Sequence, residues 1–199
     1  MANKVYNMAG GLHSAAAYSA FEDAQYGTCV ANDMSFVVSA GTGMNVEVST
    51  GDGLISTGTG FARRIGTDAV NTVPVDAASS ANPRIDAVVA YIDNSVAPTV
   101  NVVDNTNGIL KFKAVAGTPA SSPSQPSQAQ IQTSIGAGNP YMVLAYVTIP
   151  TGATSTSVAT FVDARNIAGS SIRLILSTTD IGEGADLPEN TLYGVYEEN

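Results

Sequence analysis

The residue types that most often carry chemistry are few in this chain. His13 is the single histidine, so a Ser-His-Asp or Cys-His arrangement would have to use it. It lies among small residues in the first turn of an expected helix, without a partner at a suggestive spacing, and we interpret it as a surface or interface residue. Cys29 is the single cysteine. With one cysteine, the chain cannot form an internal disulfide or a multi-cysteine metal site. Because Cys29 follows a helix end, we interpret it as a small buried apolar residue.

Carboxylates are the remaining candidates for acid–base chemistry. Asp86 and Asp93 are seven residues apart on one expected strand, so strand alternation puts them on opposite faces and they cannot form a couple. Residues 104–108 (DNTNG) superficially resemble a calcium loop, but the ligand spacing and the missing glutamate favour an Asx-rich hairpin turn. The glycine triplets do not extend to GxGxxG. We therefore expect no enzyme activity, no metal and no cofactor.

Two Arg–Asp pairs stand at the ends of otherwise apolar strands. Arg84 and Asp86 open one strand after an Asn-Pro, and Asp163 and Arg165 close another. One interpretation is a bidentate ion pair across a sheet edge in each case. The other is separate solvation of each side chain, because exposed ion pairs contribute little. Both pairs are candidates for structural ion pairs.

The composition of the 199 residues favours β structure. Charged residues make up 13%, about half the usual quarter, and small residues replace them. Eight Lys and Arg against 17 Asp and Glu argue against nucleic acid as a partner. No apolar run reaches the roughly 18–20 residues of a membrane span, and the N-terminus lacks a signal-peptide core. We expect a protein made in a cytoplasm, with no membrane partner.

The apolar pattern predicts a mainly β fold: an antiparallel β-sandwich or barrel-like module with an N-terminal helix and one short helix after a Pro/Ser-rich segment. Glycine triplets separate short apolar runs at the spacing of antiparallel strands joined by tight turns. Strands are expected at 36–39, 44–50, 61–66, 70–75, 84–93, 99–103, 109–115, 141–149, 158–163 and 172–176. The Pro/Ser-rich segment 117–128 should run extended over the surface before a helix over 128–135, which Ser127 caps.

Three segments are expected along the chain. Residues 1–33 form an N-terminal docking segment and helix, 34–168 a β-rich module, and 169–199 one or more strands and an acidic tail. The helix is predicted over 12–26, with Ser14 as its cap and Gly27 as its stop.

Both ends of the chain carry candidate docking residues. On the N-terminal helix, Leu12, Tyr18 and Phe21 form a narrow apolar stripe, which suits contact with copies of itself in a homotrimer, near the axis. At the other end, 180–199 hold six acids and no base. Leu192, Tyr193 and Tyr196 favour a strand that packs on its own trimer or on a neighbour's sheet edge. A frayed terminus is the alternative.

Several of these segments resemble a module near the N-termini of upper baseplate, tail-fibre and head-fibre proteins of phages of Gram-positive hosts. The stretches are 39–55 (SAGTGMNVEVSTGDGLI), 75–89 (VDAASSANPRIDAVV), 141–154 (YMVLAYVTIPTGAT) and 161–165 (FVDAR). The resemblance spans about 39–166. It implies a trimeric, non-enzymatic β-module of the virion that docks a fibre or receptor-binding element. Longer members continue into a fibre or head, whereas about thirty residues follow Arg165 here, which favours an adaptor, a decoration protein or a short spike.

Three classes of function follow. The first is a bacteriophage virion structural protein at the tail, baseplate or head surface, assembled in the host bacterial cytoplasm, with other virion proteins as partners. The second is a carbohydrate- or host-receptor-binding module, which would need an exposed aromatic platform although the chain has no Trp. The third is a glycan-degrading tail enzyme, which needs two carboxylates at a fixed separation. The first is the prediction.

Overall fold

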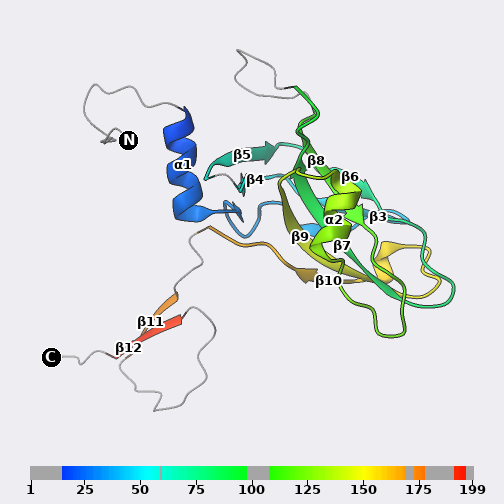
Figure 1. Ribbon diagram of the computed structural model, residues 1–199. Helices are drawn as coiled ribbons and strands as arrows, with labels where there is room; N and C mark the ends of the chain where they lie inside the picture. Colours follow the sequence, from blue (N-terminus) through cyan, green and yellow to red (C-terminus); the bar gives the residue numbers. More distant parts are fainter. Residues whose placement is uncertain (1–14, 59, 98–107, 169–172, 178–190, 196–199) are drawn as a thin grey trace, which may run out of the picture.

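The computed structural model describes residues 15–58, 60–97, 108–168, 173–177 and 191–195 (Figure 1). The helices are α1 (Ala15–Tyr26), α2 (Gln128–Ile135) and the short 3-10 helix η1 (Thr156–Val158). The strands are β1 (Cys29–Val30), β2 (Val38–Ala40), β3 (Asn45–Val48), β4 (Gly51–Ser56), β5 (Ala62–Thr67), β6 (Asn71–Pro74), β7 (Arg84–Ile92), β8 (Leu110–Val115), β9 (Tyr141–Ile149), β10 (Thr160–Asp163), β11 (Arg173–Ser177) and β12 (Thr191–Val195).

The described strands form three antiparallel sheets and one parallel pair. The largest sheet has the order β10-β9-β7-β8, and the two smaller ones have the orders β2-β3-β6 and β1-β4-β5. β11 and β12 pair in parallel. The expected mainly β, antiparallel fold with two α-helices is therefore confirmed.

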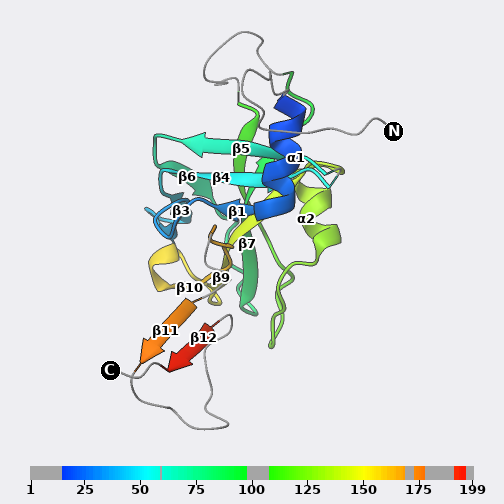
Figure 2. The same cartoon turned by 90° about the vertical axis from the view of Figure 1, so that its left-hand side faces the viewer.

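The four-stranded sheet is the middle layer of the molecule. One of its faces packs on the two smaller sheets, and α2 covers part of the other face (Figure 2). The larger core lies between the sheets and contains Phe36, Ile55 and Leu144, all fully buried. The smaller core lies under α2, where Ile131 and Ile135 meet apolar residues of β7 and β8. Because β7 is buried on both faces, its sequence is a nearly continuous apolar run.

A bulge shifts the alternation of β9 part of the way along the strand. The pairing of β7 with β9 shifts between Val88 and Val89, where one extra residue of β9 is accommodated. Before the shift Met142 and Leu144 face the larger core, and after it Val147 and Ile149 do. The spacing of three between Leu144 and Val147 is the mark of this bulge, because a regular strand alternates every two residues.

Most expected elements lie within one or two residues of the observed ones. The helix over 128–135 is as predicted, and the Ser127 hydroxyl accepts from the Gln130 N–H while the Gln130 side chain accepts from the Ser127 N–H. α1 ends before Gly27, whose φ is +59°. Ser14 and the strand expected at 99–103 lie outside the described residues. The expected run 36–39 is corrected, because Phe36 adopts a φ of +56° in a turn and its ring packs on Phe112.

The Pro/Ser-rich segment 117–128 is less superficial than expected. Gly117 and Pro126 are buried, and the Ala120 N–H donates to the Pro83 carbonyl. The segment is thereby attached to the beginning of β7 before it leads into α2. Backbone hydrogen bonds supply this attachment, and side-chain composition does not reveal them.

Candidate functional site

Arg84 and Asp86 form a buried, bidentate ion pair at the beginning of β7. Arg84 Nε lies 2.8 Å from Asp86 Oδ1, and Nη2 lies 3.1 Å from Oδ2. The two residues are only 4% and 1% exposed. They are two positions apart on one strand and hence on the same face, so the pair lies within a strand and not across a sheet edge as one interpretation of the sequence had it.

The remaining hydrogen bonds of this pair join three segments of the chain. Arg84 Nη1 donates to the Ala77 carbonyl at 2.7 Å, and Nη2 donates to the Asp76 carbonyl at 2.6 Å. On the other side, the Gly117 N–H donates to Asp86 Oδ1 at 3.0 Å. The pair thus connects the segment before β7 with the segment after β8. Since both charges are hydrogen-bonded, the cost of burying them is offset.

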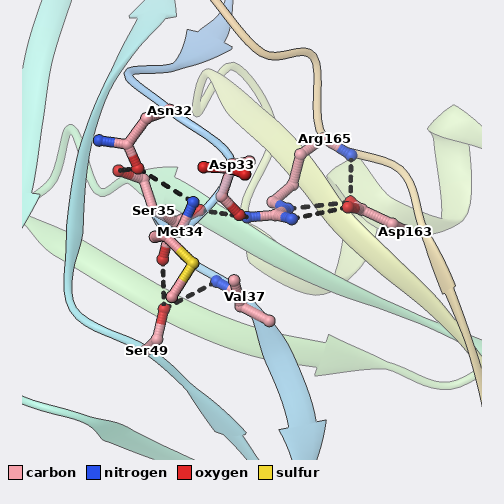
Figure 3. A network of polar contacts seen from close by, with 8 residues as sticks. All are labelled: Asn32, Asp33, Met34, Ser35, Val37, Ser49, Asp163 and Arg165. Carbon is pink, nitrogen blue, oxygen red and sulfur yellow. Dashed lines mark hydrogen bonds and ion pairs between the residues drawn. The ribbon is translucent and has the colours of Figure 1, made fainter.

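Asp163 and Arg165 form a second bidentate pair at the end of β10 (Figure 3). Arg165 Nε lies 2.9 Å from Asp163 Oδ1, and Nη2 lies 2.7 Å from Oδ2. Arg165 Nη1 also donates to the carbonyls of Asp33 and Ser35, at 2.9 and 2.6 Å. The hydrogen bond from Arg165 holds the pKa of Asp163 below its usual value. The Asp163 side chain is 54% exposed, so this pair is partly in water.

The turn that receives Arg165 is itself held by side chains. Asn32 Oδ1 accepts from the Met34 N–H and from the Ser35 hydroxyl, while the Ser49 hydroxyl donates to the Met34 carbonyl (Figure 3). Arg165 therefore joins the end of β10 to the turn between β1 and β2. Each arginine of the two motifs binds an aspartate and also donates to two carbonyls of another segment, which is close in sequence for Arg84 and far in sequence for Arg165.

Three tyrosines gather on the face of the four-stranded sheet that α2 partly covers. Tyr91 of β7 pairs in register with Tyr141 of β9, and Tyr146 lies further along β9. All three are half-buried around the smaller core. Burial raises the pKa of Tyr141, with a smaller contribution from Tyr146. Val162 of β10 pairs with Tyr146 and is 53% exposed, so the apolar surface continues to the sheet edge.

This tyrosine face was not predicted from the sequence. Tyr91 and Tyr141 are fifty positions apart, and only the strand register brings them together. The available signal was the alternation within β9, where Tyr141 and Val143 share a face, but the bulge changes the phase before Tyr146.

An open cleft of about 1260 Å³ lies between the β4–β5 hairpin and β8. Its lining combines Arg63, Arg64 and Asp52 with the apolar Leu110 and Phe112. Arg64 forms an ion pair with Glu22 of α1, with Nη2 and Oε1 2.8 Å apart. Both signs of charge line the cleft beside apolar side chains, so the lining does not define one class of ligand.

The other predicted site residues are distributed as follows. Cys29 is buried in β1, where burial raises the pKa of its thiol and disfavours the reactive thiolate. Tyr18 and Phe21 belong to α1, and Leu192 and Tyr193 belong to β12. The remaining candidates lie outside the described residues: Leu12, His13, Tyr196 and 104–107 of the Asx-rich loop.

The described residues hold no group of three or more His, Cys, Asp or Glu side chains placed to bind a metal ion. None of the helices among them is long and apolar enough to cross a membrane. Comparison with protein-family models, with curated proteins and with solved structures found no match to this chain.

Proposed function

We propose that this chain is a non-enzymatic structural protein of a tailed-bacteriophage virion. It serves as a trimeric adaptor, fibre or decoration component at the tail, the baseplate or the head surface, and its partners are copies of itself and other virion proteins. The proposal starts from the resemblance of 39–55, 75–89, 141–154 and 161–165 to modules of such proteins.

One observation supports the proposal most directly: the four resembling stretches meet in a single core. Val46 of the first stretch, Val88 of the second and Leu144 of the third are buried in the larger hydrophobic cluster, and the partly buried Phe161 of the fourth packs against it. The stretches therefore belong to one folding unit. A compact, rigid β-module of this kind is suited to holding neighbours in an assembly.

The charged residues of the resembling stretches also support a structural role. Arg84 and Arg165 each bind an aspartate in bidentate fashion and donate to carbonyls of another segment. Asp86 and Asp163 thus each have an arginine partner, which supports a structural role for both carboxylates. Changing Asp86 to Asn should therefore leave peptidoglycan and polysaccharide substrates as untouched as the parent protein leaves them, whereas turnover that this change abolishes in a folded protein would contradict the proposal.

Localisation on particles is the direct test. Antibodies raised against the recombinant chain should label intact phage particles from a lysate of the bacterium in which the gene is expressed. Quantitative mass spectrometry of the same particles should find a copy number divisible by three. Recovery of the chain only in the soluble fraction, with particles unlabelled, would contradict the proposal.

Binding of a host-surface glycan is a second candidate function, favoured by the tyrosine face. Tyr91, Tyr141 and Tyr146 lie on one sheet face, and tyrosine rings offer both an apolar surface and a polar tip. If a glycan binds there, Tyr146→Ala should weaken binding of the chain to host cell-wall polysaccharide at least tenfold. Tyr26→Ala is the matched control, because Tyr26 is exposed at the end of α1. Equal binding by both variants would remove this candidate.

A further inference from the structure

The helix α1 lies against one face of the β1-β4-β5 sheet (Figure 2). Partners in a ladder share a face, and the register pairs Cys29 with Leu54 and Leu54 with Arg64. Arg64 binds Glu22 of α1, so this shared face is the one that α1 covers. The opposite face, which includes Ile55, belongs to the larger core. Cys29, only 2% exposed, therefore lies on the face that points away from the core.

Few contacts among the described residues hold α1 on this face. Arg64 Nη2 and Nε lie 2.8 and 2.9 Å from Glu22 Oε1, and the Ser19 hydroxyl donates to the Ala62 carbonyl. The Arg64 side chain is 82% exposed, so water surrounds the ion pair and its contribution is small. Neither hydrophobic cluster includes a described residue of α1. The described packing of both cores therefore does not depend on α1.

One carboxylate oxygen of α1 disfavours the docked position of the helix. Asp23 Oδ1 is buried and has no hydrogen-bond partner within the described part of the chain. A buried polar atom without a partner has lost its hydration, which costs free energy for as long as the helix stays docked. When the helix leaves the sheet, water can hydrate the carboxylate again. Asp23 thus offsets part of the stabilisation that the ion pair contributes.

A hinge for such a movement stands between α1 and β1 at Gly27. Its φ of +59° lies in the left-handed region, and a Cβ atom there would meet nothing within 4 Å. The next residue is fixed to its surroundings, because the Thr28 hydroxyl accepts from the Ser56 N–H and the Thr28 carbonyl accepts from the Asn166 side chain. The chain is anchored from Thr28 onward, so a rotation at Gly27 moves the helix and leaves the sheet in place.

We infer that α1 is a hinged lid on the β1-β4-β5 sheet. It turns about Gly27, the ion pair between Glu22 and Arg64 is its latch, and its opening uncovers the outer face of the sheet while both cores stay folded. Opening makes Cys29 accessible to solvent. It also moves the start of α1 on an arm of roughly 18 Å, the length of a twelve-residue helix. The lid does not depend on the proposed virion role.

Thiol modification of the full chain tests the lid, because Cys29 is the single cysteine. In native buffer, iodoacetamide should modify Cys29 at least about tenfold faster than global unfolding permits, with the far-UV circular dichroism of the sheets unchanged. Arg64→Met removes the latch and should raise the rate of modification roughly two- to fivefold. Mass spectrometry measures the modified fraction against time.

Arg63→Met is the matched control for the latch. Arg63 is the neighbouring exposed arginine of β5, but it pairs in register with Ile55 on the opposite face and forms no ion pair among the described residues. Its removal should leave the rate of Cys29 modification unchanged. Equal rates in the parent and Arg64→Met, an equal acceleration in Arg63→Met, or modification only at the rate of global unfolding would overturn the inference.

Substitutions at the hinge and at the unpartnered carboxylate supply a second test. Gly27→Ala strains the docked backbone without a steric contact and should speed Cys29 modification roughly five- to thirtyfold. Gly138→Ala, at a φ of +82° between α2 and β9, is equally free of contacts and should leave the rate unchanged.

Asp23→Ala removes the unpartnered oxygen and should slow Cys29 modification at least about fivefold. Gln25→Ala, at an exposed position of the same helix, should not. A Gly27→Ala rate equal to that of the parent, or an Asp23→Ala rate above it, would contradict the hinged lid.

Discussion

Arg84 and Asp86 are the most deeply buried charged residues of the described chain. A charged pair in an interior costs desolvation energy, which only close geometry and further hydrogen bonds offset. Here the guanidinium reaches two carbonyls besides the carboxylate, and the carboxylate accepts from a third segment. Removing one partner would leave the other charge buried without compensation.

Arg84→Met should therefore lower the free energy of unfolding by about 3–5 kcal/mol, because it leaves Asp86 charged and buried. Arg165→Met is the comparison. It should lower the free energy of unfolding by less, because the Asp163 side chain is 54% exposed and water can solvate it. Urea unfolding followed by far-UV circular dichroism measures both. Equal losses of unfolding free energy in the two variants would show that burial does not determine how much each ion pair stabilises the fold.

Asp93 offers a pH-dependent contact at the end of β7. Hydrogen bonds from Lys111, 2.6 Å away, and from Ser95 lower the pKa of Asp93 from 3.8 to about 2. A carboxyl whose pKa is lower in the folded state stabilises the fold above its unfolded pKa, and this contribution disappears as the pH falls toward the folded pKa. The stabilisation should therefore be complete above pH 4 and should be lost as the pH falls to about 2.

Lys111→Met tests the cause of this shift, because the hydrogen bond from Lys111 contributes most to it. Carboxyl ¹³C chemical shifts, followed by NMR against pH, should give Asp93 a midpoint near 2 in the parent and one closer to 3.8 in the variant. The midpoint of Asp163 serves as an internal control, since its main partner is Arg165. An Asp93 midpoint that does not move would assign the shift to Ser95.

The connecting segment after β8 lies close to a neighbouring backbone at Gly117. A Cβ atom on Gly117 would lie 2.1 Å from the Ile85 carbonyl oxygen, so a side chain cannot be accommodated without moving the segment. The same movement would disturb the hydrogen bond from Gly117 to Asp86. The close approach explains how the Pro/Ser-rich segment is kept against β7.

Gly117→Ala should lower the free energy of unfolding by about 1–3 kcal/mol, the usual cost of overpacking. Gly66→Ala in β5 is the matched control. Its Cβ would lie 2.6 Å from Asp52 Oδ1, the end of an exposed side chain that can rotate away. Chemical denaturation of the two variants measures the difference. An effect at Gly66 as large as at Gly117 would contradict the argument from backbone contact.

For the whole molecule, β7 contributes buried residues to both cores. Its residues Val88 and Ala90 belong to the core between the sheets, and Ala87 and Val89 belong to the core under α2. Because one strand serves both, neither core can lose its packing without affecting the other. The sheets and α2 should behave as one cooperative unit.

This coupling predicts a single unfolding transition for the sheets and α2. The chain has no Trp, so near-UV absorbance reports on its eight tyrosines without a contribution from tryptophan, and three of them, Tyr91, Tyr141 and Tyr146, lie at the core under α2. Far-UV circular dichroism reports on the sheets. The two denaturation curves should coincide. Ile131→Ala should shift both curves together, with a loss of about 2–5 kcal/mol. A tyrosine transition that precedes the far-UV one would show that the helix layer unfolds separately.

Interactions between near neighbours were determined by the sequence itself. Ser127 and Gln130 are three apart and form the capping box of α2, and Gly27 ends α1 with a positive φ. Arg84 with Asp86 and Asp163 with Arg165 were recognisable as pairs, because each is two positions apart. The mainly β class followed from alternation and turn spacing for the same reason.

Only the tertiary structure decided the contacts that depend on how distant strands align. The sequence could not indicate that Arg165 reaches the carbonyls of Asp33 and Ser35, some 130 positions away. Nor could it indicate that Tyr91 and Tyr141 share a face, or that β11 and β12 pair in parallel. Periodicity assigns residues to the faces of one strand, but strand order, direction and register follow from packing the whole chain.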